Sequence, residues 1–114
     1  MNDLKARTKR FALDAIRLCS TFPRKEELVI VARQLMRAAT SVAANYRAAC
    51  RAKSKADFIN KLSIVEEEAD EAGFWLEMLG ELQREEEGEL SRLRNEASQL
   101  VAIMVASKKT ARGN

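Results

Sequence analysis

The sequence predicts an all-α fold: one domain, residues 1–114, arranged as an antiparallel up-and-down four-helix bundle. Composition is the first indication, because the 114 residues include only one proline and four glycines, and the abundant Ala, Leu, Glu, Arg and Lys favour helices. A second indication is that apolar residues recur at alternating steps of three and four along four segments, as in helices that bury one face. Short connections between these segments favour antiparallel neighbours.

The first two predicted helices cover about residues 3–21 and 24–50, with a turn at Pro23 between them. Proline disrupts a helix interior but suits the first turn of a new helix. The first helix has one apolar row, which is expected to face the core: Leu4, Phe11, Ala15, Leu18 and Phe22.

Three rows of side chains distinguish the second predicted helix. The row expected in the core consists of Leu28, Val31, Leu35, Ala38, Val42, Asn45 and Ala49, and a second apolar row beside it consists of Val29, Ala32, Met36, Ala39, Ala43 and Tyr46. A third row, on the other side, carries Arg33, Arg37, Arg47 and Arg51. This helix is therefore expected to present a core face, a small-residue face and an arginine stripe.

The third predicted helix covers about residues 55–80 and the fourth about 89–108. Ser54 followed by Asp57 resembles the capping box that begins many helices, and Gly80 or the acidic run 85–88 is expected to end the third helix. The predicted core residues of the third helix are Phe58, Leu62, Val65, Ala69, Ala72, Leu76 and Leu79, and those of the fourth are Leu90, Leu93, Ala97, Leu100 and Met104.

The second and third helices carry more apolar residues than one buried face requires. The surplus is clearest at Val29, Met36, Tyr46, Phe74 and Trp75. Contiguous exposed apolar surface usually marks an interface, so we expect a homo-oligomer. The alternative is a wide apolar arc that is buried entirely within one chain.

Charge is strongly segregated along the chain. Residues 1–57 contain 13 Lys/Arg and 5 Asp/Glu, residues 58–87 contain 2 and 10, and residues 88–114 contain 5 and 2. A basic segment of this kind suits an anionic partner such as nucleic acid, and the candidate binding residues are Arg33, Arg37, Arg47, Arg51, Lys53 and Lys55. The alternative is ion pairing, between helices or between subunits, with an acidic row on the third helix, formed by Glu66, Asp70, Glu77 and Glu81. We expect pairing mainly at Arg37 and Arg47, whereas Arg51, Lys53 and Lys55 lie in a turn and should be free.

Residues 34–79 resemble the 23S rRNA intervening-sequence (S23-like) family of bacterial four-helix bundles. The matching residues are Gln34, Leu35, Arg37, Ala38, Ala39, Ser41, Val42 and Asn45, then Ser54, Asp57 and Phe58, then Glu67 and Glu71. The resemblance implies an up-and-down bundle, often assembled as a ring of five, but it establishes no molecular activity. Many members continue with Glu-Gly where this chain has Ala48 and Ala49, so no role of those two residues is transferred.

Four polar residues of this motif, Ser41, Asn45, Glu67 and Glu71, are interpreted as a structural polar core that fixes helix register or oligomeric state. No catalytic, cofactor or metal site is predicted, because the chain has no histidine, no glycine-rich phosphate loop and no Ser/His or Cys/His pair. No apolar run is long enough for a membrane span and no signal peptide is recognisable, which favours the cytoplasm. The prediction is a non-enzymatic oligomeric protein that binds RNA or other nucleic acid; the alternative is a protein–protein adaptor that binds no nucleic acid.

Overall fold

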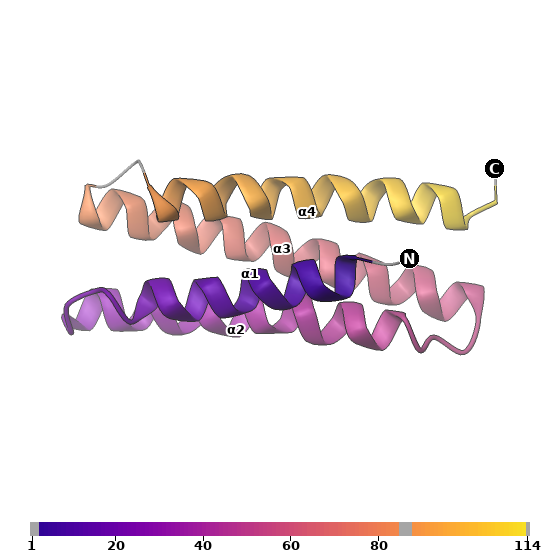
Figure 1. The fold of residues 1–114 in the computed structure, drawn as a ribbon, viewed down its shortest axis with the longest axis horizontal. Helices are drawn as coiled ribbons and strands as arrows, with labels where there is room; N and C mark the ends of the chain where they lie inside the picture. Colours follow the sequence, from indigo (N-terminus) through magenta and orange to yellow (C-terminus); the bar gives the residue numbers. More distant parts are fainter. Residues whose placement is uncertain (1–2, 85–87, 114) are drawn as a thin grey trace.

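The protein folds into four helices, and no strand is present in residues 3–84 and 88–113, which the computed structural model describes. The helices are α1 (Leu4–Cys19), α2 (Glu26–Ala49), α3 (Lys55–Gln83) and α4 (Glu89–Ala111). Consecutive helices run in opposite directions and lie side by side (Figure 1), and the molecule measures 46 × 21 × 20 Å. The predicted all-α class with four helices is confirmed.

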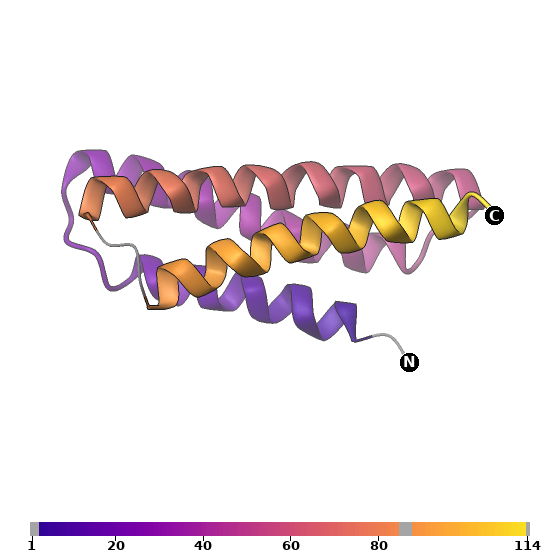
Figure 2. The same cartoon turned by 90° about the horizontal axis from the view of Figure 1, so that it is seen from above.

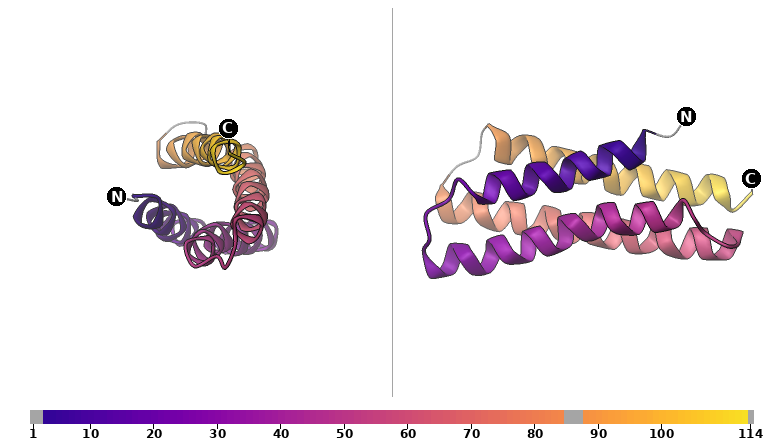
Figure 3. Two further views of the ribbon diagram at one scale, coloured as in Figure 1. Left: turned by 90° about the vertical axis from the view of Figure 1, so that its right-hand side faces the viewer. Right: turned by 60° about the horizontal axis from the view of Figure 1, so that its bottom comes forward.

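The helices follow one another around the bundle in chain order. Seen end-on in Figure 3, they lie in the order α1, α2, α3, α4, and Figure 2 shows the shorter α1 alongside part of α4. The contact between α1 and α4 is the smallest of the four helix pairs that touch. A part-buried ion pair strengthens it, because Nε of Arg7 lies 2.7 Å from a carboxylate oxygen of Glu96.

The core consists mainly of the apolar rows that the sequence indicates. Leu35, Leu62, Leu76 and Leu100 are fully buried. Thr8 is the buried polar residue among the described residues, at 1% exposure. Its hydroxyl donates a 2.7 Å hydrogen bond to the carbonyl of Leu4, so burial leaves no unpaired donor.

One predicted core position on α2 differs from the structure. Asn45 is only half-buried, and its side-chain amide donates to the carbonyl of Ser41 at 2.9 Å. Its neighbour Tyr46 is 4% exposed and belongs to the core instead. The reason is the period of the α-helix. Tyr46 follows Leu28 by about five turns of 3.6 residues, so both lie on the same side of α2. A strict seven-residue repeat gradually rotates away from that side, and it places Asn45 at the edge of the core.

The observed helix ends also depart from the expected ones. α1 ends at Cys19, and the hydroxyl of Thr21 bonds back to the carbonyl of Leu18 at 2.7 Å. α3 continues through Gly80, which is buried, and ends at Gln83 before Arg84 in a left-handed conformation (φ 55°). The acidic run proposed as the other possible end of α3 lies largely outside the described residues. No helix in the described part of the chain combines the length and apolar character of a membrane span.

Candidate nucleic-acid interface

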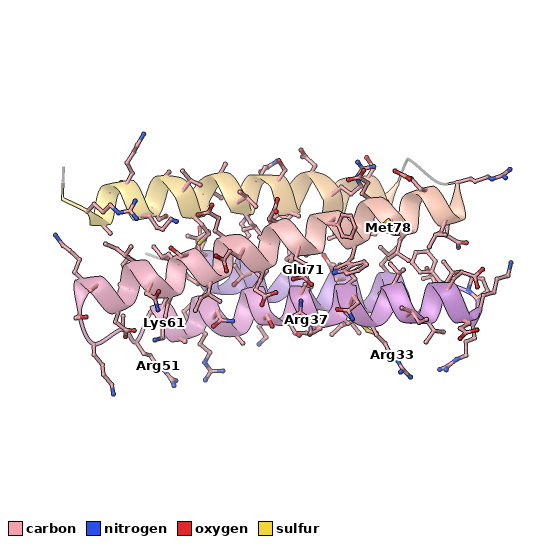
Figure 4. The ribbon with its side chains drawn as sticks, turned by 180° about the vertical axis from the view of Figure 1, so that it is seen from behind. Arg33, Arg37, Arg51, Lys61, Glu71 and Met78 are labelled. Carbon is pink, nitrogen blue, oxygen red and sulfur yellow. The ribbon has the colours of Figure 1, made fainter. Side chains whose placement is uncertain are left out.

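The six candidate residues all come from residues 28–56, a stretch that contains no Asp or Glu. Four of them, Arg33, Arg37, Arg47 and Arg51, lie along α2 and at its C-terminal end, as two pairs whose members are about one turn apart. Figure 4 shows the side chains of Arg33 and Arg51 pointing away from the bundle, whereas that of Arg37 lies beside Glu71 of α3. The arginine stripe therefore divides into free and paired members.

Arg37 is the paired member. Its guanidinium donates to Glu71 and lies 3.3 Å from a carboxylate oxygen of Glu68. Glu71 also accepts a 3.0 Å hydrogen bond from the indole N–H of Trp75. Arg37 thus joins α2 to α3, as the pairing alternative predicted, and its cation is already partly neutralised.

In the described part of one chain, the predicted acidic row of α3 does not pair with the arginines of α2. Asp70, Glu77 and Glu81 make no ion pair within the described residues, and Glu66 pairs with Lys108 of α4 at 2.8 Å. The side of α3 that faces α2 carries Glu68 and Glu71, because the core row turns the others toward α4 or outward. Arg47 was expected to pair but has no ion-pair partner in the described structure.

The Arg37 contact makes part of the stability acid-sensitive. The hydrogen bond from Trp75, and then that from Arg37, lower the pKa of Glu71 below its usual value. A carboxyl with a depressed folded-state pKa stabilises the fold above its unfolded pKa of about 4.3, and this contribution is lost as the pH falls through the lower folded value. We expect Glu71→Gln to lose less stability than the wild type between about pH 7 and about pH 3. Urea denaturation at the two pH values measures this, and equal losses would contradict the assignment.

Arg51, Lys53 and Lys55 lie at the connection between α2 and α3. All three are exposed, and no side-chain ion pair restrains them in the described structure. Asp57 shapes this turn: its carboxylate accepts from the backbone N–H of Lys53 at 3.1 Å, and its own N–H donates to the Ser54 hydroxyl at 3.0 Å. The capping box predicted here is present in the Ser54 to Asp57 direction, and it leaves the three cationic side chains in solvent.

The C-terminal end of α4 lies at the same end of the bundle (Figure 1) and adds further cations. Residues 97–114 contain Lys108, Lys109 and Arg112 but no Asp or Glu. Lys108 points inward to Glu66, while Lys109 and Arg112 are exposed and make no ion pair with described residues. We call the five free cations at this end the basic pole: Arg51, Lys53, Lys55, Lys109 and Arg112.

Sequence reasoning placed three residues of the basic pole among its candidates and missed the two on α4. The signal was available in the acid-free segment 97–114, but cations there are also typical of an ordinary helix C-terminus. Arg33 and Arg47 do not belong to the pole. They line separate grooves between α1 and α2.

The four residues interpreted as a polar core do not meet within one chain. Asn45 bonds to Ser41 on α2, whereas Glu71 bonds to Trp75 and Arg37. Glu67 is exposed and has no partner among the described residues. No hydrogen bond in the described structure joins the α2 pair to either glutamate.

Comparison with known proteins identifies the family of this chain. The family model described as 23S rRNA-intervening sequence protein matches residues 2–106. A crystal structure of a protein of unknown function from the S23 ribosomal protein family of Bacteroides thetaiotaomicron is 30% identical, with a TM-score of 0.83 over 92% of this chain and 97% of that one. A search of curated proteins gave no match. The resemblance inferred from the motif is therefore confirmed, and the chain belongs to the 23S rRNA-intervening sequence protein family.

Proposed function

We propose that the protein is a non-enzymatic, self-assembling helical bundle that binds RNA or other nucleic acid through its basic pole. The observation that carries this proposal is the set of five exposed cations at one end of the bundle, none of them in an ion pair with a described residue. Ammonium and guanidinium groups that displace counterions from phosphates supply most of the affinity of non-specific nucleic-acid binding.

The composition of the pole supports contact with the sugar–phosphate backbone rather than with bases. Reading of single-stranded bases usually needs exposed aromatic rings for stacking. Tyr46 lies near the pole but is 4% exposed, and the exposed Phe74 lies in the middle of α3. Recognition through charge and shape follows from this arrangement.

Self-assembly is supported by apolar side chains that the single chain leaves in solvent. Leu13, Ile16, Ile30, Phe74, Leu82 and Val105 are each at least 40% exposed. Of the surplus residues noted in the sequence, Tyr46 is buried within its own chain, so the intramolecular alternative holds at that position. The family resemblance favours a ring of five, which would present several basic poles to one nucleic-acid strand and raise the avidity.

The basic pole predicts a specific loss of binding. Replacing Arg51, Lys53 and Lys55 together by alanine should weaken binding to a labelled single-stranded RNA by about tenfold or more and reduce the slope of log K against log salt by about 2. Fluorescence anisotropy titrations at several salt concentrations measure both quantities.

A matched control has the same charge change at the opposite end of the bundle. Arg24 and Lys25 lie in the α1–α2 turn, and Arg17 lies in the last turn of α1, where it pairs with Asp14 at 3.3 Å. All three are exposed, and their triple alanine variant should bind RNA nearly as the wild type does. Equal weakening by the two variants would show that only net charge matters, and no weakening by either would refute the basic pole.

The second candidate function is a protein–protein adaptor without nucleic acid. It is favoured by Glu67, Asp70, Glu77 and Glu81, which are exposed on α3 and have no ion-pair partner in the described residues. Light-scattering mass and the ratio of absorbance at about 260 and 280 nm, read on one size-exclusion peak, separate the two functions. An oligomer free of nucleic acid that also fails to bind added RNA would favour the adaptor.

A further inference from the structure

Two exposed faces of the chain carry opposite charges, and each also presents apolar side chains. The first is a groove of about 570 Å³ between α1 and α2, which we call the α1–α2 groove. Its apolar lining includes Leu13, which is 40% exposed, and the small residue Ala44 of α2. Lys5, Lys9 and Arg47 line the same groove, and no acidic residue does. The groove is thus suited to an apolar side chain flanked by carboxylates.

The second face, on the outer side of α3, has those properties. Glu67, Phe74 and Glu81 follow one another at intervals of seven residues, so they form a nearly straight stripe along the helix. The Phe74 ring is 49% exposed and packs edge-on against Trp75, with ring centroids 4.8 Å apart. Packing on one edge limits the rotamers of this ring, so it projects as a preformed knob. The carboxylates of Glu67 and Glu81 are exposed and unpaired within the described structure.

The spacing of the charges on the two faces agrees. On α2, Arg33 and Arg47 are two heptads apart with Thr40 midway, and on α3, Glu67 and Glu81 are two heptads apart with Phe74 midway. At 1.5 Å per residue, each charged pair spans about 21 Å. Thr40 lines the α1–α2 groove, and no carboxylate lines the groove where the knob would lie.

We propose that the outer face of α3 docks into the α1–α2 groove of a second copy of this chain. This inference rests on the proposed self-assembly and specifies its contact: Phe74 enters the groove near Thr40, Glu67 meets Arg47, and Glu81 meets Arg33. The relative direction of the two contacting helices follows from symmetry. If copies are related by rotation about an axis parallel to the helices, α3 of one copy runs antiparallel to α2 of the next, as the two helices do within one chain.

The same contact cannot form inside one chain. α2 and α3 are already packed against each other through their core faces, and of the α2 arginines only Arg37 reaches carboxylates of α3. Because the two docking faces are different surfaces, the contact is heterologous, so repetition leads to a closed ring or to an open filament. In such an interface the buried apolar knob supplies affinity and the flanking ion pairs fix register and direction, whereas like charges placed opposite one another strongly disfavour the contact.

Charge reversal tests the contact directly. The single variants Arg47→Glu and Glu67→Arg should each run as a single chain in size exclusion with light scattering, because each places like charges opposite one another. The double variant Arg47→Glu/Glu67→Arg restores opposite charges and should recover the mass of the wild-type assembly. Arg10→Glu is the matched control, since Arg10 is exposed on α1 and lines neither face; its mass should equal that of the wild type.

The outcomes separate this contact from the proposed function. A wild-type protein that is a single chain overturns both self-assembly and the contact. An assembly that persists in both single variants, or that is lost in them and not recovered in the double variant, overturns the contact and leaves self-assembly standing. RNA binding is measured on the same samples: neither Arg47 nor Glu67 belongs to the pole, so a single-chain variant should keep the binding of one pole and lose only the avidity of the assembly. Far-UV circular dichroism of each variant confirms that the helices are intact.

Discussion

Replacing Leu35 by alanine is expected to lower the free energy of unfolding by about 2–5 kcal/mol. Leu35 is fully buried in α2, the helix that packs against both α1 and α3. Truncation removes the transfer free energy of its side chain and leaves a cavity that surrounding helices refill only in part. In a domain of this size, whose total stability is typically about 5–15 kcal/mol, such a loss is a large fraction. Urea denaturation followed by far-UV circular dichroism measures it.

An exposed aliphatic residue provides the control for this substitution. Val105 is 44% exposed on α4 and lies outside both proposed docking faces, so Val105→Ala should change stability by no more than about 0.5 kcal/mol. All variants are compared at one protein concentration, because self-association would add to the apparent stability. A loss below about 1 kcal/mol for Leu35→Ala would mean that the α2 core row is loosely packed, contrary to its complete burial.

The core could be predicted from the sequence because burial along a helix depends on a simple period. Leu62, Val65 and Leu76 are fully buried in α3, where the alternating steps of three and four are regular. The prediction failed near the C-terminal end of α2, where Tyr46 replaces Asn45 in the core. A row of residues seven apart rotates around a straight helix by about 20° per heptad. Over one heptad this rotation is negligible, but over nearly three it moves the row off the buried side, and a neighbouring residue takes the core position.

The candidate site was only partly predictable, because ion pairing depends on how two helices are rotated against each other. The sequence indicated that arginines of α2 would pair with acids of α3, and Arg37 does so, but with Glu68 and Glu71. Which acids face α2 is decided by the rotation of α3, and a row of acids on its own does not reveal that rotation. The association of Lys109 with the α2–α3 connection depends on where two distant helix ends meet, which only the fold shows (Figure 1).

Enlarging a small core residue is expected to destabilise the bundle as well. Ala72 lies in the α3 core row at 0% exposure, and Ala38 of α2 is equally buried on the facing helix. Small side chains allow two helices to approach closely, so Ala72→Leu should force off-rotamer packing or separate the helices and lower stability by about 1–3 kcal/mol. Leucine and alanine have similar helix propensities, so the change reports packing rather than intrinsic helix preference.

The control for this substitution is Ala102→Leu, at an exposed position on α4. The same increase in size in solvent should leave stability within about 0.5 kcal/mol of the wild type. An unchanged or higher stability of Ala72→Leu would show that unfilled space lies between α2 and α3, which would contradict close approach at their alanines. Together with Leu35→Ala, the result tests whether the core is close-packed. A close-packed interior loses stability when a core side chain becomes smaller and also when one becomes larger.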